Sequence, residues 1–138
     1  MVKIKIRRRG TAIVDTPEGI LVTAGRKGIF ILPGGGALRN ETRTKAAIRE
    51  LQEETGLCAV STKYLFRHIG KIHKSRHGGY YQDHHTVCLI KAEGVAKPKH
   101  EVKYIAYYKT SSDVRISIVT KEIINKYTCK VDWFWAEC

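Results

Sequence analysis

The chain has 138 residues, a length that suits one compact domain with one functional site, and 43% of them are hydrophobic, which is enough for a single core. Lys and Arg outnumber Asp and Glu by 25 to 13, so the formal net charge is +12. This surplus favours a polyanionic partner or a strongly phosphorylated substrate, and it is equally compatible with a surface that is basic only for solubility.

Membrane and disulfide-stabilised classes find no support in the sequence. No run of about 18 apolar residues occurs, and the charged segment 1–9 lacks the apolar stretch of a signal peptide. The cysteines at positions 58, 88, 129 and 138 lie far apart without a C-x-x-C pair, which indicates neither a zinc ribbon nor a disulfide framework. We expect a soluble cytoplasmic protein with reduced thiols and no membrane partner.

The first third of the chain has the pattern of short strands joined by turns. Val2, Ile4 and Ile6 alternate with basic residues, which predicts a strand, and Pro33 should end a short apolar strand because it lacks a backbone donor. The expected elements are strand 2–15, turn 15–19, strand 20–24, turn 25–28 and strand 29–32.

The clearest helix is predicted for residues 42–55. Thr42 is a suitable N-cap, Gly56 stands at the position where a helix often takes a left-handed residue, and Ala47 and Leu51 lie on one apolar side.

The remainder of the chain is predicted to hold a long hairpin, a further strand and a second helix. Segments 57–71 and 80–91 have strand character and flank a basic, histidine-containing stretch that ends in two glycines. Residues 102–109 read as a strand, and apolar residues recur at helical spacing from 118 to 127. The order is therefore β-rich, helix, β-rich, helix.

Three carboxylates share one side of the predicted central helix. At 100° per residue Glu50, Glu53 and Glu54 fall within one 100° sector, with Leu51 beside them to anchor the helix. Gathered carboxylates repel one another unless a cation compensates them, and oxygen ligands suit magnesium or manganese. Taken alone, the three residues are more often a solvated acidic helix face than a metal site.

The residues around these carboxylates strengthen the case for a metal site. Together they match the Nudix box over residues 35–57, and the chain is identified by this resemblance as a member of the Nudix hydrolase family, similar to MutT. The preceding segment 30–35 resembles the family's approach to the box, and segment 101–105 resembles a late family strand. Asn40 replaces a common glycine and tolerates the same backbone angles, whereas Leu38 replaces a common acidic residue. The matching positions are Gly35, Glu41, Arg49, Glu50, Leu51, Glu53, Glu54, Gly56 and Leu57.

The resemblance implies a fold, namely an α/β/α sandwich with a mixed β-sheet between helices, formed by a single Nudix domain over residues 1–138. It also implies roles for individual residues. Glu50 and Glu54 are expected to be direct metal ligands, with Glu53 binding a second ion or orienting water. Glu93 or Glu101 could complete the site, which leaves the identity of the general base open. The implied catalytic residues are Arg49, Glu50 and Glu53; the metal ligands are the Gly34 carbonyl, Glu50, Glu53, Glu54 and Glu101; and the structural residues of the motif are Gly35, Glu41 and Gly56. Arg49 is expected to pair with Glu41 or with a helix carboxylate.

Other residues have weaker claims to function. The basic stretch 71–77 could hold phosphates or an RNA backbone, or could be polar only for solubility. The apolar residues 133–135 should dock on their own domain or on a partner chain, and the second alternative would make a homodimer. The candidates for substrate contact are Arg26, Phe30, Arg76 and Tyr81.

The implied activity is hydrolysis of a nucleoside diphosphate linked to another group, with Mg²⁺ or Mn²⁺ as cofactor, to give a nucleoside monophosphate and a phosphorylated product. Oxidised nucleotides and dinucleoside polyphosphates fit the same chemistry. The high basic charge makes RNA 5′-end pyrophosphohydrolysis an alternative, and a non-catalytic module that binds nucleotide or RNA is a second one.

Overall fold

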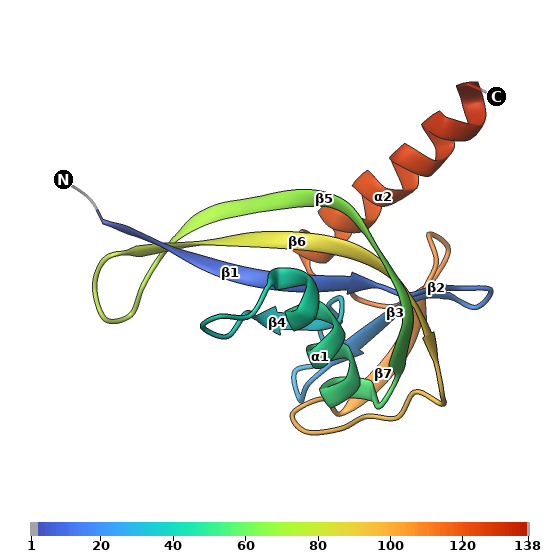
Figure 1. Cartoon of the computed structure of the whole chain (residues 1–138), viewed down its shortest axis with the longest axis horizontal. Helices are drawn as coiled ribbons and strands as arrows, with labels where there is room; N and C mark the ends of the chain where they lie inside the picture. The colour runs from blue at the N-terminus through green and yellow to red at the C-terminus, as the bar shows by residue number, and fades with distance from the viewer. Residues whose placement is uncertain (1–2, 138) are drawn as a thin grey trace.

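The computed structural model of the chain describes residues 3–137, with side chains described as far as Cys129 (Figure 1). Val2 and the side chains of residues 133–135, whose docking was expected, lie outside this description. None of the described helices is long and apolar enough to cross a membrane. The elements are β1 (Ile4–Ile13), β2 (Asp15–Thr16), β3 (Gly19–Ala24), β4 (Gly34–Gly36), α1 (Arg43–Thr55), β5 (Cys58–Lys74), β6 (Tyr80–Glu93), β7 (Tyr104–Tyr108) and α2 (Ile118–Glu137).

The described strands form two sheets. The first has the order β4-β1-β6-β5, in which β1 runs parallel to β6 while the other neighbours are antiparallel, so this sheet is mixed. The second is antiparallel, in the order β2-β3-β7. The predicted long hairpin is confirmed as β5 and β6; β5 runs three residues further towards the turn than expected, and β6 ends two residues later.

The segment around Pro33 differs from the expected strand 29–32. Phe30 and Ile31 make only isolated bridges, and the strand β4 begins after the proline, where it pairs with β1. Pro33 is tolerated because its carbonyl is the group that is used: it accepts a hydrogen bond from Ala12 N at 2.9 Å. The segment thus passes from one sheet to the other: the expected strand 29–32 is reduced to two isolated bridges before Pro33, and the glycines after it form β4.

The two helices cover opposite sides of the mixed sheet. Ala12 packs in a core with Ala47 and Leu51 of α1, whereas its neighbour Ile13 packs in a core with Ile123 of α2. Successive strand residues point to opposite faces, so the alternation along β1 serves both cores. This arrangement confirms the predicted α/β/α sandwich.

Helix α1 is fixed at both ends and along its side. The Thr42 hydroxyl accepts a hydrogen bond from Lys45 N at 3.1 Å, and Gly56, with φ 78°, donates to the Gln52 carbonyl at 2.8 Å. A Cβ at Gly10 of β1 would lie 2.0 Å from the Arg43 carbonyl oxygen, so only glycine lets α1 approach the sheet this closely.

One end of the mixed sheet extends beyond both helices as a three-stranded projection that ends in the β5–β6 turn (Figure 1). We call residues 3–9 and 67–85 the basic arm. Its isoleucines at positions 4, 6, 69 and 72 are 42–53% exposed, so the outer part of the arm is paired by its backbone without a covering layer, whereas His68 at its base is buried and contacts Lys126 of α2.

Candidate active site

The helix carboxylates meet the glycine segment of β4. Glu54 is only 8% exposed, and its Oε1 accepts a hydrogen bond from Gly34 N at 3.1 Å. Glu50, one helical turn earlier, lies so close to Gly35 that a Cβ there would come within 2.6 Å of its carboxyl carbon. Two carboxylates four residues apart are therefore seated on two consecutive glycines.

The environment of Glu54 disfavours its charged form. Burial, helped by the negative charges of Glu50 and Glu101, raises the pKa of the Glu54 carboxyl to about 7, although the Gly34 amide and Arg9 act to lower it. A buried carboxylate with acidic neighbours gains stability when a cation compensates it. The oxygen donors present here are those that a hard divalent ion prefers, so the residues fit Mg²⁺ or Mn²⁺.

Arg49 ties the loop before α1 to the carboxylates. Its Nε and Nη2 donate to the two oxygens of Glu41 at 2.8 and 3.0 Å, and its Nη1 donates to Glu50 at 2.9 Å and to Glu53 at 3.2 Å. Both contacts expected for Arg49 are thus present. The Arg49 hydrogen bond, together with that from Leu38 N, lowers the pKa of Glu41 to about 2.

The three helix carboxylates do not occupy equivalent positions. Glu53 is 47% exposed and points to Arg49, while Glu54 is buried against Gly34. Within the described residues no three His, Cys, Asp or Glu side chains already stand at ligand distance from a common point. Glu50 lies between Glu53 and Glu54 in its contacts. Like Glu53 it accepts a hydrogen bond from Arg49, and like Glu54 it lies against the glycines of β4, where its charge raises the pKa of Glu54.

The buried carboxylates open on a hollow of about 770 Å³. Its wall combines acidic and basic groups in a way that suits a phosphate compound held beside a cation. Glu101 and Arg26, two of the expected site residues, belong to this wall together with Glu50 and Glu54, whereas Glu93 lies on the exposed end of β6 and does not.

Other expected substrate residues lie elsewhere. Phe30 packs against the α2-side core, Arg76 is exposed in the turn that ends the basic arm, and Tyr81 is on the arm with Arg7 over its ring at 4.2 Å. Sequence reasoning missed Arg9, which lines the hollow beside Gly34. The alternation of the first strand predicts that Arg9 and Gly10 point to opposite faces of the sheet. Only the pairing of β1 with β4 brings Arg9 to the carboxylates.

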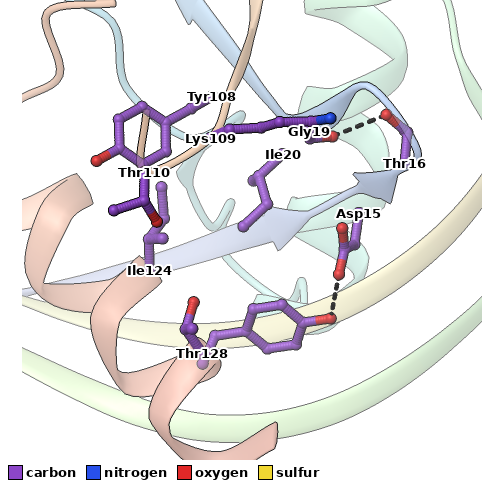
Figure 2. A pocket seen from close by; sticks show the side chains of 10 residues that line it. Asp15, Thr16, Gly19, Ile20, Tyr108, Lys109, Thr110, Ile124 and Thr128 are labelled. Atoms are coloured by element: carbon purple, nitrogen blue, oxygen red, sulfur yellow. Dashed lines mark hydrogen bonds between the residues drawn. The ribbon is translucent and has the colours of Figure 1, made fainter. Parts of the chain in front are cut away.

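A second hollow, of about 290 Å³, lies where α2 meets the β2–β3 turn (Figure 2). Among the described residues that line it, Asp15 is the one acidic side chain, and it already accepts a hydrogen bond from the Tyr127 hydroxyl at 2.6 Å. This hollow lacks the paired carboxylates of the first, so we assign the candidate active site to the first.

Comparison with known proteins agrees with this geometry. Residues 6–124 match the model of the NUDIX domain. A nudix hydrolase family member from Chromobacterium violaceum shares 38% identity and has a TM-score of 0.75, covering 90% of this chain and 77% of its own. A MutT NUDIX hydrolase from Burkholderia pseudomallei has 18% identity and a TM-score of 0.71, covering 88% and 97%. An ADP-ribose pyrophosphatase from Streptococcus suis has 15% identity and a TM-score of 0.58, covering 83% and 81%. No curated protein matches the chain.

The mixed sheet between two helices places the chain in the α/β/α class of folds, with glycine-seated carboxylates at the edge of the sheet. The chain belongs to the NUDIX family, and it is a pyrophosphohydrolase.

Proposed function

We propose that the chain hydrolyses the pyrophosphate linkage of a nucleoside diphosphate joined to another group, in a reaction that requires Mg²⁺ or Mn²⁺. The observation that carries the proposal is Glu54, a carboxyl buried against the Gly34 amide whose pKa is raised to about 7 beside Glu50 and Glu101. Structural stability alone gives no reason to bury one acid next to two others.

The residues that would hold the ion are Glu50 and Glu54, with the Gly34 carbonyl and Glu101 beside them in the hollow. Glu53, which accepts a hydrogen bond from Arg49, is a further candidate ligand. When bound, a divalent cation supplies Lewis acidity to the phosphate oxygens and offsets their charge. The ligands come from α1, β4 and the segment before β7, so the ion would join three separate parts of the fold.

The chain's own groups perform the remaining tasks. Arg9, Arg26 and Lys27 line the hollow and can neutralise charge that grows on the phosphate oxygens during substitution. The oxygen of water forms a bond to phosphorus, the anhydride P–O bond breaks, and the leaving phosphate keeps the bridging oxygen. A carboxylate accepts the water proton, and Glu50 and Glu53 are our candidates for it.

Arg49 acts through these carboxylates. Its contacts with Glu41, Glu50 and Glu53 hold the loop and the helix in one arrangement, so we propose it as a positioning residue for the reaction. Gly35 and Gly56 serve the same geometry, because Gly35 leaves room for Glu50 and Gly56 ends α1.

The test is replacement of the carboxylates. We expect Glu54→Gln and Glu53→Gln each to lower turnover at least ~100-fold in Mg²⁺ or Mn²⁺ while the fold is retained. Glu93→Gln is the matched control, because it removes one exposed carboxylate outside the hollow. Substrates to be screened are nucleotide sugars, ADP-ribose, dinucleoside polyphosphates and oxidised nucleoside triphosphates, with phosphate-containing products separated and identified. Near-normal turnover in both helix variants would refute the proposed site.

A further inference from the structure

The positive charge of the chain is concentrated in one projecting part. The basic arm, residues 3–9 and 67–85, contains nine Lys and Arg residues against a single acidic residue, Asp83. The arm's net charge is therefore +8, out of +12 for the whole chain, and it is carried by 26 of the 138 residues. Keeping like charges together on a narrow ribbon is unfavourable by itself, and a bound polyanion would relieve this repulsion.

Three hollows that share lining residues lead from the arm to the candidate active site. One hollow of about 580 Å³ lies on the arm and is lined by Lys3, Lys5 and Arg7. Arg7 also lines the neighbouring hollow of about 190 Å³, whose wall includes Arg9, Gly34 and Gly35. Those last three residues in turn line the hollow that contains Glu50 and Glu54. Arg7 and Arg9 thus stand at the two junctions of a single path, which we call the basic path.

The alternation of β1 explains why these side chains share one face. Lys5, Arg7 and Arg9 are separated by two residues each, so they point to the same side of the sheet. From Lys3 to Arg9 the strand spans roughly 20 Å at about 3.3 Å per residue. That length exceeds a mononucleotide and suits several linked phosphates in a row.

Arg7 is held in place before any ligand binds. Its Nε and Nη2 donate to Asp83 at 2.6 and 3.0 Å, and its guanidinium lies 4.2 Å from the centre of the Tyr81 ring. The His73 ring stacks on Tyr81 at 5.2 Å. Asp83 is the arm's one acidic residue and pairs with Arg7, so the arm offers no second carboxylate to its other lysines and arginines.

The hollow on the arm also has an apolar lining. Tyr81, which pairs with Lys5 and shares its face of the sheet, lines it beside the lysines. Lysines next to an aromatic side chain match a chain that has both phosphates and bases. A duplex keeps its bases inside, whereas a single strand can place them in such a hollow.

We propose that the basic path binds single-stranded nucleic acid, with the phosphodiester backbone along Lys5, Arg7 and Arg9 and its 5′ end directed towards Glu54. The direction of the strand rests on the hydrolase function proposed above, while the binding itself does not.

The test compares charge removal on the arm with the same removal elsewhere. The double variant Lys3→Gln/Lys5→Gln loses two exposed lysines of the path, and Lys91→Gln/Lys121→Gln loses two exposed lysines outside it. A 3′-labelled 12-nucleotide single strand with a 5′-hydroxyl is titrated by fluorescence anisotropy at several salt concentrations. RNA and DNA of one sequence are both used, with inorganic polyphosphate as competitor.

We expect the arm variant to weaken binding about tenfold or more and to reduce the slope of log K against log salt by about 1.4, because each backbone contact in a single strand contributes about 0.7. The control variant should bind as the unchanged protein does. Stronger binding of RNA than of DNA would identify RNA as the ligand, and the reverse result DNA. Hydrolysis of a small nucleoside diphosphate derivative should be the same in both variants.

Equal oligonucleotide binding by the two variants, with normal small-substrate hydrolysis, would overturn the proposal. So would binding of polyphosphate without binding of either nucleic acid. If the unchanged protein hydrolyses none of the small substrates but binds the oligonucleotide more strongly than the arm variant does, the proposed hydrolase function is refuted and nucleic-acid binding by the basic path is supported.

Discussion

Gly10→Ala tests how closely α1 must approach β1. The added Cβ would lie 2.0 Å from the Arg43 carbonyl oxygen and 2.5 Å from Ala47 N, both of them backbone atoms that no rotamer change can move away. Ordinary contacts need about 3.5 Å, so the helix must shift by more than about 1 Å. Overpacking of this kind lowers the free energy of unfolding by about 1–3 kcal/mol. Because the neighbouring atoms belong to the backbone, we expect about 3 kcal/mol for Gly10→Ala.

The free energy of unfolding of Gly10→Ala is measured by thermal and denaturant unfolding and compared with that of a control variant, Gly36→Ala. Gly36, which pairs with Arg9 of β1, has nothing within 4 Å of an added Cβ, so Gly36→Ala should change the free energy of unfolding by less than about 0.5 kcal/mol. For a chain of this length about 3 kcal/mol corresponds to a fall of roughly 10 °C in Tm. Turnover should fall as well, because α1 carries the carboxylates and an error of about 1 Å can cost ~100-fold. Equal stability of the two variants would refute the packing argument.

Two further predictions concern Arg49 and His85. Arg49→Lys keeps the charge but loses the planar fork that grips both oxygens of Glu41, so kcat should fall at least ~10-fold with little change in the unfolding midpoint; an unchanged kcat would show that the fork does not position the carboxylates. His85, whose Nδ1 lies 2.8 Å from the Thr11 hydroxyl, has its pKa lowered to about 4 by burial and by Arg9. The unfolded imidazole takes up a proton below about pH 6.5 while the folded one stays neutral until about pH 4, so this residue's contribution to stability is lost as pH falls through that interval. His85→Gln should flatten the decline in unfolding midpoint between pH 7 and pH 4.5, and an equally steep decline would contradict the assignment.

Local signals made the central helix and its carboxylates predictable. Thr42 and Gly56 mark the ends of α1, and the spacing of Glu50 and Glu54 depends only on helical geometry. Glu101 was expected from the family resemblance and lines the same hollow.

The features that were not predictable from the sequence depend on pairing between strands that are distant along the chain. The place of Arg9 depends on β1 meeting β4, and that of the basic path on β1 meeting β6, and neither register can be read from one strand. The strand after Pro33 gives no local signal either, because proline lacks a backbone donor and three glycines follow it, while the Pro33 carbonyl still accepts a hydrogen bond from Ala12 N of β1. The isoleucines at positions 4 and 6 correctly indicated a strand, but alternation does not reveal whether a layer covers it.

The parallel pairing of β1 with β6 joins partners as far apart as Arg7 and Asp83, which are separated by 76 positions. During synthesis β1 must therefore wait until β6 has been made, whereas the β5–β6 hairpin needs only its own short turn to form. Closing so long a loop is slow, so this step should limit the folding rate. In that interval the lysines and arginines of the first strand repel other nascent copies and keep an unpaired edge from joining them.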